Sequence, residues 1–287
     1  METGTPGPVR PHVSFSQLSM YLRCSMQYYF RYVLGLKQPP AIPLAVGKGG
    51  HAALEANGRH KIRTGNDFDT ENLLDLASTE IDREASDLSA AERGTPQFGM
   101  SKDGAIASLK VFRLKDAARV IPAAVETEFN LDLNVGIEDR PNHFPIRIVN
   151  GRIDLITTDA GIEDYKFSGR MKSQADIDLS PQLTLYGRVF QQLTGALPAK
   201  VGLRAFLMGK TPDSRVAYRD PSLMTPEAQD RRFKRLAYQF REVERGIHNG
   251  TFIPTDDPIT CSWCGFRDRC QSSLVTDFEA QKIRGEA

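Results

Sequence analysis

Apolar residues recur every three to four positions along the first third of the chain, a spacing that indicates amphipathic helices. We expect one helix from Ser14 or Ser16 to Gly35, because serine often caps a helix start and glycine often follows a helix end. A second helix should begin near Leu44 or Gly50. The N-terminal part of the chain is therefore predicted to be helical.

The pattern changes at Pro122, where apolar and polar residues begin to alternate, as in strands. Before this point, helices are predicted over residues 69–89 and 103–121, with a loop between them. The elements predicted after Pro122 are strands over 123–135, 143–159, 161–169, 199–209 and 214–220, a helix from Ser180 and Pro181 to Gly195, and a charged helix from Thr225 to about Gly250. This order predicts an α/β core with a helical N-terminal elaboration.

Composition argues against some classes of function and leaves others open. Lys and Arg total 37 and Asp and Glu total 36, and this near-neutral charge neither indicates nor excludes a nucleic-acid partner. The chain lacks a run of about 18 apolar residues, so no membrane partner is expected. Residues 1–13 resemble a flexible, proline-containing lead-in without a secretory signal, so we expect a cytoplasmic location.

Two acidic residues and a lysine fall at neighbouring strand positions. Asp154 follows an apolar run, and Asp164 and Lys166 share one face of the next predicted strand, since side chains two apart in a strand point the same way. A hairpin turn at residues 157–161 would bring Asp154 beside them. Converging carboxylates suit Mg²⁺ or Mn²⁺, although aspartates at strand ends are also ordinary turn residues. Alternation favours Asp164 over its neighbour Glu163 as the metal-facing acid.

The four cysteines suggest a second metal site. Cys261, Cys264 and Cys270 are closely spaced, and Cys24 lies far away near the N-terminus. In a reducing compartment cysteines are more often metal ligands than disulfides. Four thiolates accept either Zn²⁺ or an iron–sulfur cluster, and the spacing leaves both open.

Six motifs occur in an order that resembles RecB-like nucleases of the PD-(D/E)XK superfamily. They are "SFSQLSMYLRCSMQYYFRYVLGL", "GKGGHAALE", "GRIDLI", "IEDYK", "QLTLY" and "CSWCGFRDRC". The one-plus-three cysteine arrangement is similar to the iron–sulfur branch, which includes AddB-type nuclease domains and CRISPR-adaptation exonucleases. The resemblance implies a restriction-endonuclease-like mixed sheet flanked by helices, with a cluster that joins the two chain ends.

The resemblance also implies roles for individual residues. His51, Asp154 and Asp164 would be metal ligands, together with the main-chain carbonyl of Tyr165, and Lys166 would be the catalytic lysine. Gln182 and Tyr186, four apart on a helix and thus on one face, would orient the lysine or contact the substrate. Cys24, Cys261, Cys264 and Cys270 would hold a structural [4Fe–4S] cluster. The glycines before His51 are expected to let the backbone turn at the helix start.

Glu126 matches an acidic position of the family, although a solvated strand face explains it equally well. The resemblance implies a Mg- or Mn-dependent deoxyribonuclease that acts as an exonuclease on single-stranded or end-opened DNA. It also implies that the protein could work with a helicase or recombination partner. A non-catalytic DNA-end-binding or recombination subunit with the same fold is the alternative, and a zinc-bound structural module with fortuitous acidic residues is a second one.

The expected domain organisation follows from these assignments. One nuclease domain covers 14–270, and a polar tail covers 271–287. The domain is predicted to consist of a helical part at 14–121, a catalytic sheet and helix at 122–210, and a C-terminal helix with the cysteine loop at 211–270.

Overall fold

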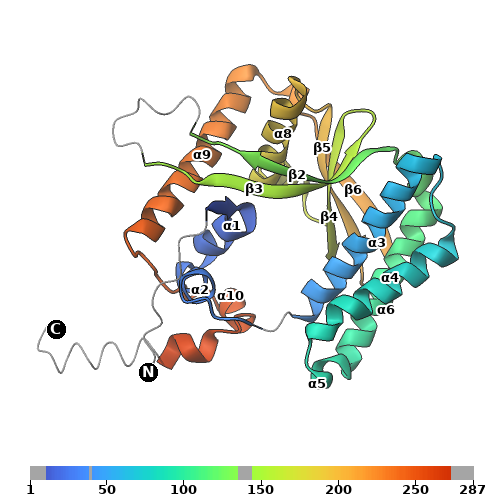
Figure 1. The fold of residues 1–287 in the computed structure, drawn as a ribbon, viewed down its shortest axis with the longest axis horizontal. Helices are drawn as coiled ribbons and strands as arrows, with labels where there is room; N and C mark the ends of the chain where they lie inside the picture. Colours follow the sequence, from blue (N-terminus) through green and yellow to red (C-terminus); the bar gives the residue numbers. More distant parts are fainter. Residues whose placement is uncertain (1–10, 39–40, 135–143, 273–287) are drawn as a thin grey trace, which may run out of the picture. The chain divides into compact units, whose positions relative to one another are not determined.

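The computed structural model describes residues 11–38, 41–134 and 144–272 (Figure 1). These residues divide into two compact units: unit 1 contains 11–38, 130–134, 144–150 and 237–272, and unit 2 contains 41–129 and 151–236. Among the described residues, the helices are too short or too polar to cross a membrane. The domain boundaries expected from the sequence remain a prediction, and most of the polar tail lies outside the described residues.

Unit 1 begins with a short strand, β1 (His12–Ser14), where part of a flexible lead-in was expected. β1 pairs in parallel with residues 148–150 of β3. Ser14 then caps α1 (Phe15–Arg23): its hydroxyl accepts from the Gln17 amide, and the Gln17 side chain accepts from the Ser14 amide. This reciprocal capping box satisfies two main-chain donors and supports the predicted helix start.

The single helix expected from residue 14 to Gly35 is wrong, because the chain is extended at Cys24 between α1 and α2 (Ser25–Tyr28). The Ser25 hydroxyl donates to the Ile253 carbonyl and accepts from the Ile253 amide, while the Met26 amide donates to the same carbonyl. These bonds to a distant segment replace helical ones. One π-helical turn (Tyr29–Val33) follows, and Gly35 then takes a left-handed φ of +67°.

The sheet is mixed, as predicted. Besides β1, its strands are β2 (Pro122–Leu131), β3 (Ile148–Thr157), β4 (Gly161–Ser168), β5 (Lys200–Leu207) and β6 (Asp213–Arg219). β4 pairs with β3 antiparallel and with β5 parallel, β5 pairs with β6 antiparallel, and β2 pairs with β3. All five predicted strands are therefore present; four are shorter than predicted, and β6 is displaced by one residue.

Helices cover this sheet within unit 2 (Figure 1). α3 (Ile42–Thr64), α4 (Thr70–Glu84) and α6 (Pro96–Lys115) form one layer, whose apolar core includes Leu54, Leu73, Leu109, Phe112, Leu155, Tyr165 and Phe206. α8 (Pro181–Thr194) starts at its Ser180 cap and ends at Gly195, as expected, and α9 (Pro226–His248) is the charged helix. The remaining short helices are α5 (Ala90–Arg93), α7 (Gln174–Asp178) and α10 (Pro258–Ser262).

The helix expected over 103–121 instead starts at Pro96 and ends at Lys115. Thr95 caps it, and Pro96 occupies its first position, where a proline costs no hydrogen bond. These start signals lie within a stretch expected to be a loop, which also contains α5. The loop expected between the two helices is therefore wrong over much of its length.

The glycines before His51 lie inside α3, not at a turn as predicted. A Cβ on Gly49 would lie 2.5 Å from the Ile81 main chain in α4, and one on Gly50 would overlap the Phe167 ring of β4. The glycines therefore permit close packing of α3 against a neighbouring helix and the sheet. This close approach brings His51 to the strands.

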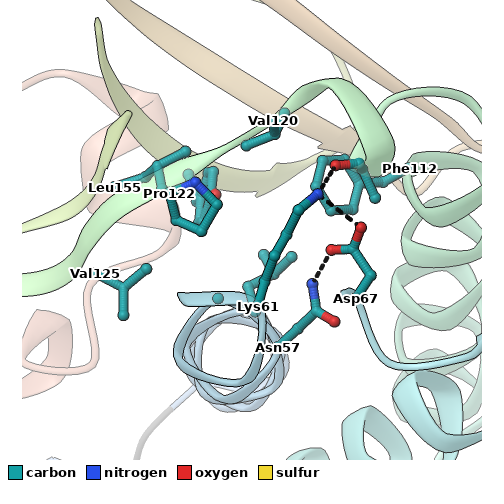
Figure 2. Close-up of a pocket in the computed structure, with 12 residues that line it drawn as sticks. Asn57, Lys61, Asp67, Phe112, Val120, Pro122, Val125 and Leu155 are labelled. Carbon is teal, nitrogen blue, oxygen red and sulfur yellow. Dashed lines mark hydrogen bonds and ion pairs between the residues drawn. The ribbon is translucent and has the colours of Figure 1, made fainter. Parts of the chain in front are cut away.

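The second half of α3 is anchored by a buried polar network beside a cavity of about 20 Å³, which can hold roughly one water (Figure 2). The Lys61 ammonium donates to Asp67 at 2.8 Å and to the Ala117 carbonyl at 2.6 Å, and Asn57 donates to Asp67 at 2.8 Å. A buried charge that is paired and hydrogen-bonded in this way avoids a large desolvation cost. The network fixes the helix that carries His51.

Candidate metal centre and catalytic site

The β3–β4 hairpin brings the two predicted aspartates together. Leu155 pairs with Glu163 in this antiparallel ladder, so Asp154 comes opposite Asp164 one position further on. The Tyr165 amide donates to Asp154 Oδ2 at 2.7 Å, which fixes that carboxylate. Asp154 and Asp164 are both almost fully buried.

His51, Glu126 and Asp154 form a compact group of ligand-type side chains. One ligand atom from each lies within 4.8 Å of the others. His51 Nδ1 is 3.6 Å from Asp154 Oδ2 and 4.0 Å from Glu126 Oε1. The three side chains come from α3, β3 and β2, so tertiary packing alone assembles them.

The sequence did not decide whether Glu126 belongs to the site or to a solvated strand face. Its φ of +47° is unusual for a residue other than glycine, and such strained backbone is often found at functional sites. Within its strand it resembled Glu128, whose side chain is largely exposed and faces Arg152. Its only sequence signal was the acidic position in "VETEF".

Asp164 faces a second set of predicted residues. The Lys166 ammonium lies 2.6 Å from Asp164 Oδ2 in an ion pair. From α8, Gln182 Nε2 donates to Asp164 Oδ1 at 2.9 Å, and the Tyr186 hydroxyl donates to the same oxygen at 3.4 Å. Asp164 is thus the point at which the lysine and both α8 residues meet.

Glu163 lies on the other face of β4, as alternation predicted. Its carboxylate accepts from Arg204 Nε at 2.5 Å and Arg204 Nη2 at 3.0 Å, and from the Tyr218 hydroxyl. These partners belong to β5 and β6. Glu163 therefore stabilises the strand order and does not face the candidate metal group.

The electrostatics of the site reflect crowded negative charge. Burial and the adjacent Asp164 raise the pKa of Asp154 from 3.8 to about 6. Burial acts to lower the pKa of Lys166, but Asp164 and Asp154 outweigh it and raise that pKa, which keeps the amine protonated. Likewise, Glu126 and Asp154 outweigh burial and raise the pKa of His51. A divalent cation would relieve this crowding.

The Tyr165 carbonyl lies 3.0 Å from His51 Nε2, on the side of the ring away from Glu126 and Asp154. If Nε2 carries the proton, this contact leaves Nδ1 as the lone-pair nitrogen that faces the carboxylates. The carbonyl here orients the imidazole. Its role as a metal ligand remains a prediction.

The comparison with protein families decides the identity of this fold. The family model for the PD-(D/E)XK nuclease superfamily matches residues 12–271, which is nearly the whole chain. The chain belongs to this superfamily. The predicted mixed α/β fold and the nuclease assignment are thereby confirmed at this level.

One solved structure supports the shared fold of this superfamily member. A protein described as a "Putative exonuclease" from Eubacterium rectale aligns with a TM-score of 0.56 and 12% identity, covering 90% of this chain and 88% of its own. The structure of SSO0001 aligns over 88% of this chain and 92% of its own at 15% identity, with a TM-score of 0.34, too low to support an argument. No curated protein matches the chain.

The donor set of this PD-(D/E)XK nuclease fits a divalent cation. One imidazole and two carboxylates suit Mn²⁺ and, with added waters, Mg²⁺. His51, Glu126 and Asp154 would hold the ion, and Asp164 lies next to them. The fit rests on the mutual distance of the ligand atoms and on the buried like charges.

The four cysteines lie in unit 1. They are partly buried. Burial, followed by the influence of Cys24, Cys264 and Cys261, raises the pKa of Cys270. The thiols are thus close enough to affect one another, and a four-sulfur donor set of this kind fits a [4Fe–4S] cluster or Zn²⁺.

Proposed function

We propose that this chain is a Mg²⁺- or Mn²⁺-dependent deoxyribonuclease that hydrolyses phosphodiesters in single-stranded or end-opened DNA. The observation that carries the proposal is the convergence of His51, Glu126 and Asp154 within 4.8 Å, next to the ion pair of Asp164 with Lys166. Metal ligands beside a protonated amine can promote phosphodiester hydrolysis, because the ion activates water and both cations stabilise the developing negative charge.

The metal ligands and Lys166 have separate roles in the proposed reaction. A bound divalent ion supplies Lewis acidity and a water of lowered pKa. Lys166, kept protonated by its carboxylate neighbours, orients the attacking water and neutralises charge that develops on the phosphate. Water attacks phosphorus in line, the P–O bond to the leaving oxygen breaks, and no covalent enzyme intermediate forms.

Gln182 and Tyr186 act through Asp164. Both donate to Oδ1, so they hold the carboxylate while Oδ2 pairs with Lys166. Burial and Asp164 raise the pKa of Tyr186 far above 10, which keeps this hydroxyl a hydrogen-bond donor. These two residues are positioning residues in the proposal.

We favour exonuclease action over endonuclease action for this protein. The Eubacterium rectale structure with a similar fold is described as a "Putative exonuclease", which supports this choice. The order of the motifs resembles RecB-like nucleases, and such enzymes act on DNA ends. A helicase or recombination partner would supply the opened end.

The cleavage test uses end-labelled single-stranded DNA with Mn²⁺ or with EDTA. Wild type should cut with Mn²⁺ only, and Asp164→Ala should lose at least about 100-fold in rate while it still binds DNA. Asp159→Asn is the matched control, because this turn carboxylate is exposed and pairs with Lys200. Metal-dependent cutting by Asp164→Ala at the wild-type rate refutes the site. Wild type that binds ends without cutting supports the DNA-end-binding alternative.

For the cysteines, we propose a structural [4Fe–4S] cluster held by Cys24, Cys261, Cys264 and Cys270. Protein purified without oxygen should be brown and absorb broadly near about 400 nm. Colourless protein that contains zinc would refute the cluster and support a zinc site. Cys264→Ser should lose the bound iron. Ser262→Ala, at an exposed neighbouring position, should keep it.

A further inference from the structure

Two arginines in unit 2 are almost fully buried, and they differ in their partners. Arg204 is held by the carboxylates of Glu163 and Asp116. Arg219, at the end of β6, makes no ion pair within 4.0 Å among the described residues. Buried charges are normally paired, so a lone buried guanidinium indicates a missing anion.

Arg219 uses only part of its hydrogen-bonding capacity. Its Nη1 donates to the Asp178 carbonyl at 2.8 Å, and its Nη2 makes one long contact of 3.4 Å with the Thr184 hydroxyl. The buried Nε has no partner. The Nε–Nη2 edge of the guanidinium is the edge that binds carboxylate or phosphate in bidentate fashion.

A second arginine adjoins the first. Arg232 of α9, partly exposed, donates to the same Asp178 carbonyl, and it too forms no ion pair in the described part of the chain. The Asp178 carboxylate acts on Arg219 from a distance and accepts a bond from Gln174. Burial and the Arg232 charge lower the pKa of Arg219 to about 10. The two like charges share one neutral acceptor, and Arg219 is compensated only in part, by the Asp178 carboxylate.

The sheet register relates this pair to the candidate metal centre. Arg219 pairs with Val201, and Val201 pairs with Ile162, so Arg219 shares a face with Ile162 and hence with Asp164. Arg219 lies two strands away from β4 across the sheet, and its partner Ile162 lies two residues from Asp164 along β4. These spacings place the Cα atoms of Arg219 and Asp164 roughly 12 Å apart. α8 touches both places, through Gln182 at Asp164 and Thr184 at Arg219.

We infer that Arg219 and Arg232 form a phosphate-binding subsite for the nucleic acid strand whose scissile bond lies at the metal centre. The inference rests on the proposed nuclease function for the identity of the anion. Every nucleotide of a DNA strand carries a phosphate, so a phosphate near the scissile one can reach these residues. Arg232, which is partly exposed, supplies the charge that first meets the phosphate.

The test measures DNA binding by the full chain in EDTA, so it does not depend on cleavage. Single-stranded oligonucleotides, with and without a terminal phosphate at either end, are titrated against wild type and Arg232→Gln over a range of salt concentrations. We expect Arg232→Gln to bind about 3- to 10-fold more weakly and to lower the salt slope by roughly 0.7. Exposed Arg235→Gln, on the same helix, is the matched control.

Each outcome has a defined meaning. If the loss occurs only with a terminal phosphate, the subsite binds a strand end; if it occurs with all oligonucleotides, the subsite binds a backbone phosphate. Arg219→Gln should show a similar loss, and circular dichroism checks that it folds. Inorganic phosphate should raise the melting temperature of wild type but not of Arg232→Gln. Folded Arg232→Gln that matches wild type in DNA affinity, salt slope and phosphate response overturns the inference, even if the wild type cleaves DNA.

Discussion

Glu163 and Asp164 are adjacent in β4, yet their carboxylates lie on opposite faces of the sheet and meet different partners. Glu163 joins β4 to β5 and β6 through Arg204 and Tyr218. Asp164 faces Lys166, Gln182 and Tyr186. One residue of register therefore separates an acid that holds the sheet from an acid of the proposed catalytic site.

This relationship predicts that two matched amide substitutions change stability by unequal amounts. Glu163→Gln should lower the free energy of unfolding by about 3–5 kcal/mol, because it leaves the buried Arg204 charge poorly compensated. Asp164→Asn should change it by less than about 1 kcal/mol, because the loss of the Lys166 ion pair is offset by relief of the repulsion from Asp154, and the amide oxygen still accepts from Gln182. Urea unfolding of both variants without metal measures the difference. Equal destabilisation would contradict the division of roles.

Lys166→Met should lose at least about 100-fold in cleavage rate with little loss of DNA or Mn²⁺ binding, because the amine acts on the developing charge. Lys200→Met is the control: this lysine lies on the neighbouring strand and pairs with the turn residue Asp159. Rates on labelled DNA at saturating Mn²⁺ compare the two variants. Near-normal cleavage by Lys166→Met would rule out its catalytic role.

Glu126→Gln should weaken Mn²⁺ binding by at least about tenfold, because it removes one anionic ligand from the group with His51 and Asp154. Glu128→Gln, two residues along the same strand, should bind as wild type, since Glu128 is exposed. Calorimetric titration with Mn²⁺ gives both affinities. The same affinity in Glu126→Gln and wild type would place the ion elsewhere.

Alanine at three glycines of α3 should separate helix propensity from packing. Gly50→Ala and Gly49→Ala should destabilise the protein by about 1–3 kcal/mol, because their Cβ atoms meet Phe167 and the Ile81 main chain. Gly47→Ala, where a Cβ meets open space, should stabilise it by about 0.5–1 kcal/mol. Thermal unfolding without metal ranks the three. Stabilisation by Gly50→Ala would show that α3 does not pack closely on β4.

The raised pKa of Asp154 predicts a pH dependence of stability in the metal-free protein. The folded-state pKa of about 6 exceeds the ordinary aspartate pKa of 3.8, so the native state binds more protons between these values. Stability from this group is therefore present at low pH and falls by up to about 2–3 kcal/mol as pH rises from 4 to 6. Asp154→Asn should remove this fall.

Urea unfolding between pH 4 and 7, with wild type and Asp154→Asn side by side, measures this effect. Saturating Mn²⁺ should stabilise the wild type increasingly as pH rises, because the ion binds the charged carboxylate. A wild-type curve that is parallel to that of Asp154→Asn across this range would contradict the buried, mutually repelling aspartates.

The sequence alone determined the local elements and the candidate chemistry. Alternation fixed the β3–β4 hairpin and assigned Asp164 and Glu163 to opposite faces, because side-chain direction in a strand depends only on position along the chain. Ser180, Pro181 and Gly195 fixed the bounds of α8 for a similar reason, since caps act within one turn. The motifs, in order, indicated the superfamily.

Tertiary structure decided what depends on contacts between distant segments. Bonds to Ile253 interrupt the first helix at Cys24, and packing against Ile81 and Phe167 accounts for glycines that looked like a turn. Strand order also decides that Glu126 lies beside His51 and Asp154. It likewise decides that the buried Nε of Arg219 has no hydrogen-bond partner. Local pattern cannot supply these features, because the energy of each lies in neighbours that are far apart in the chain.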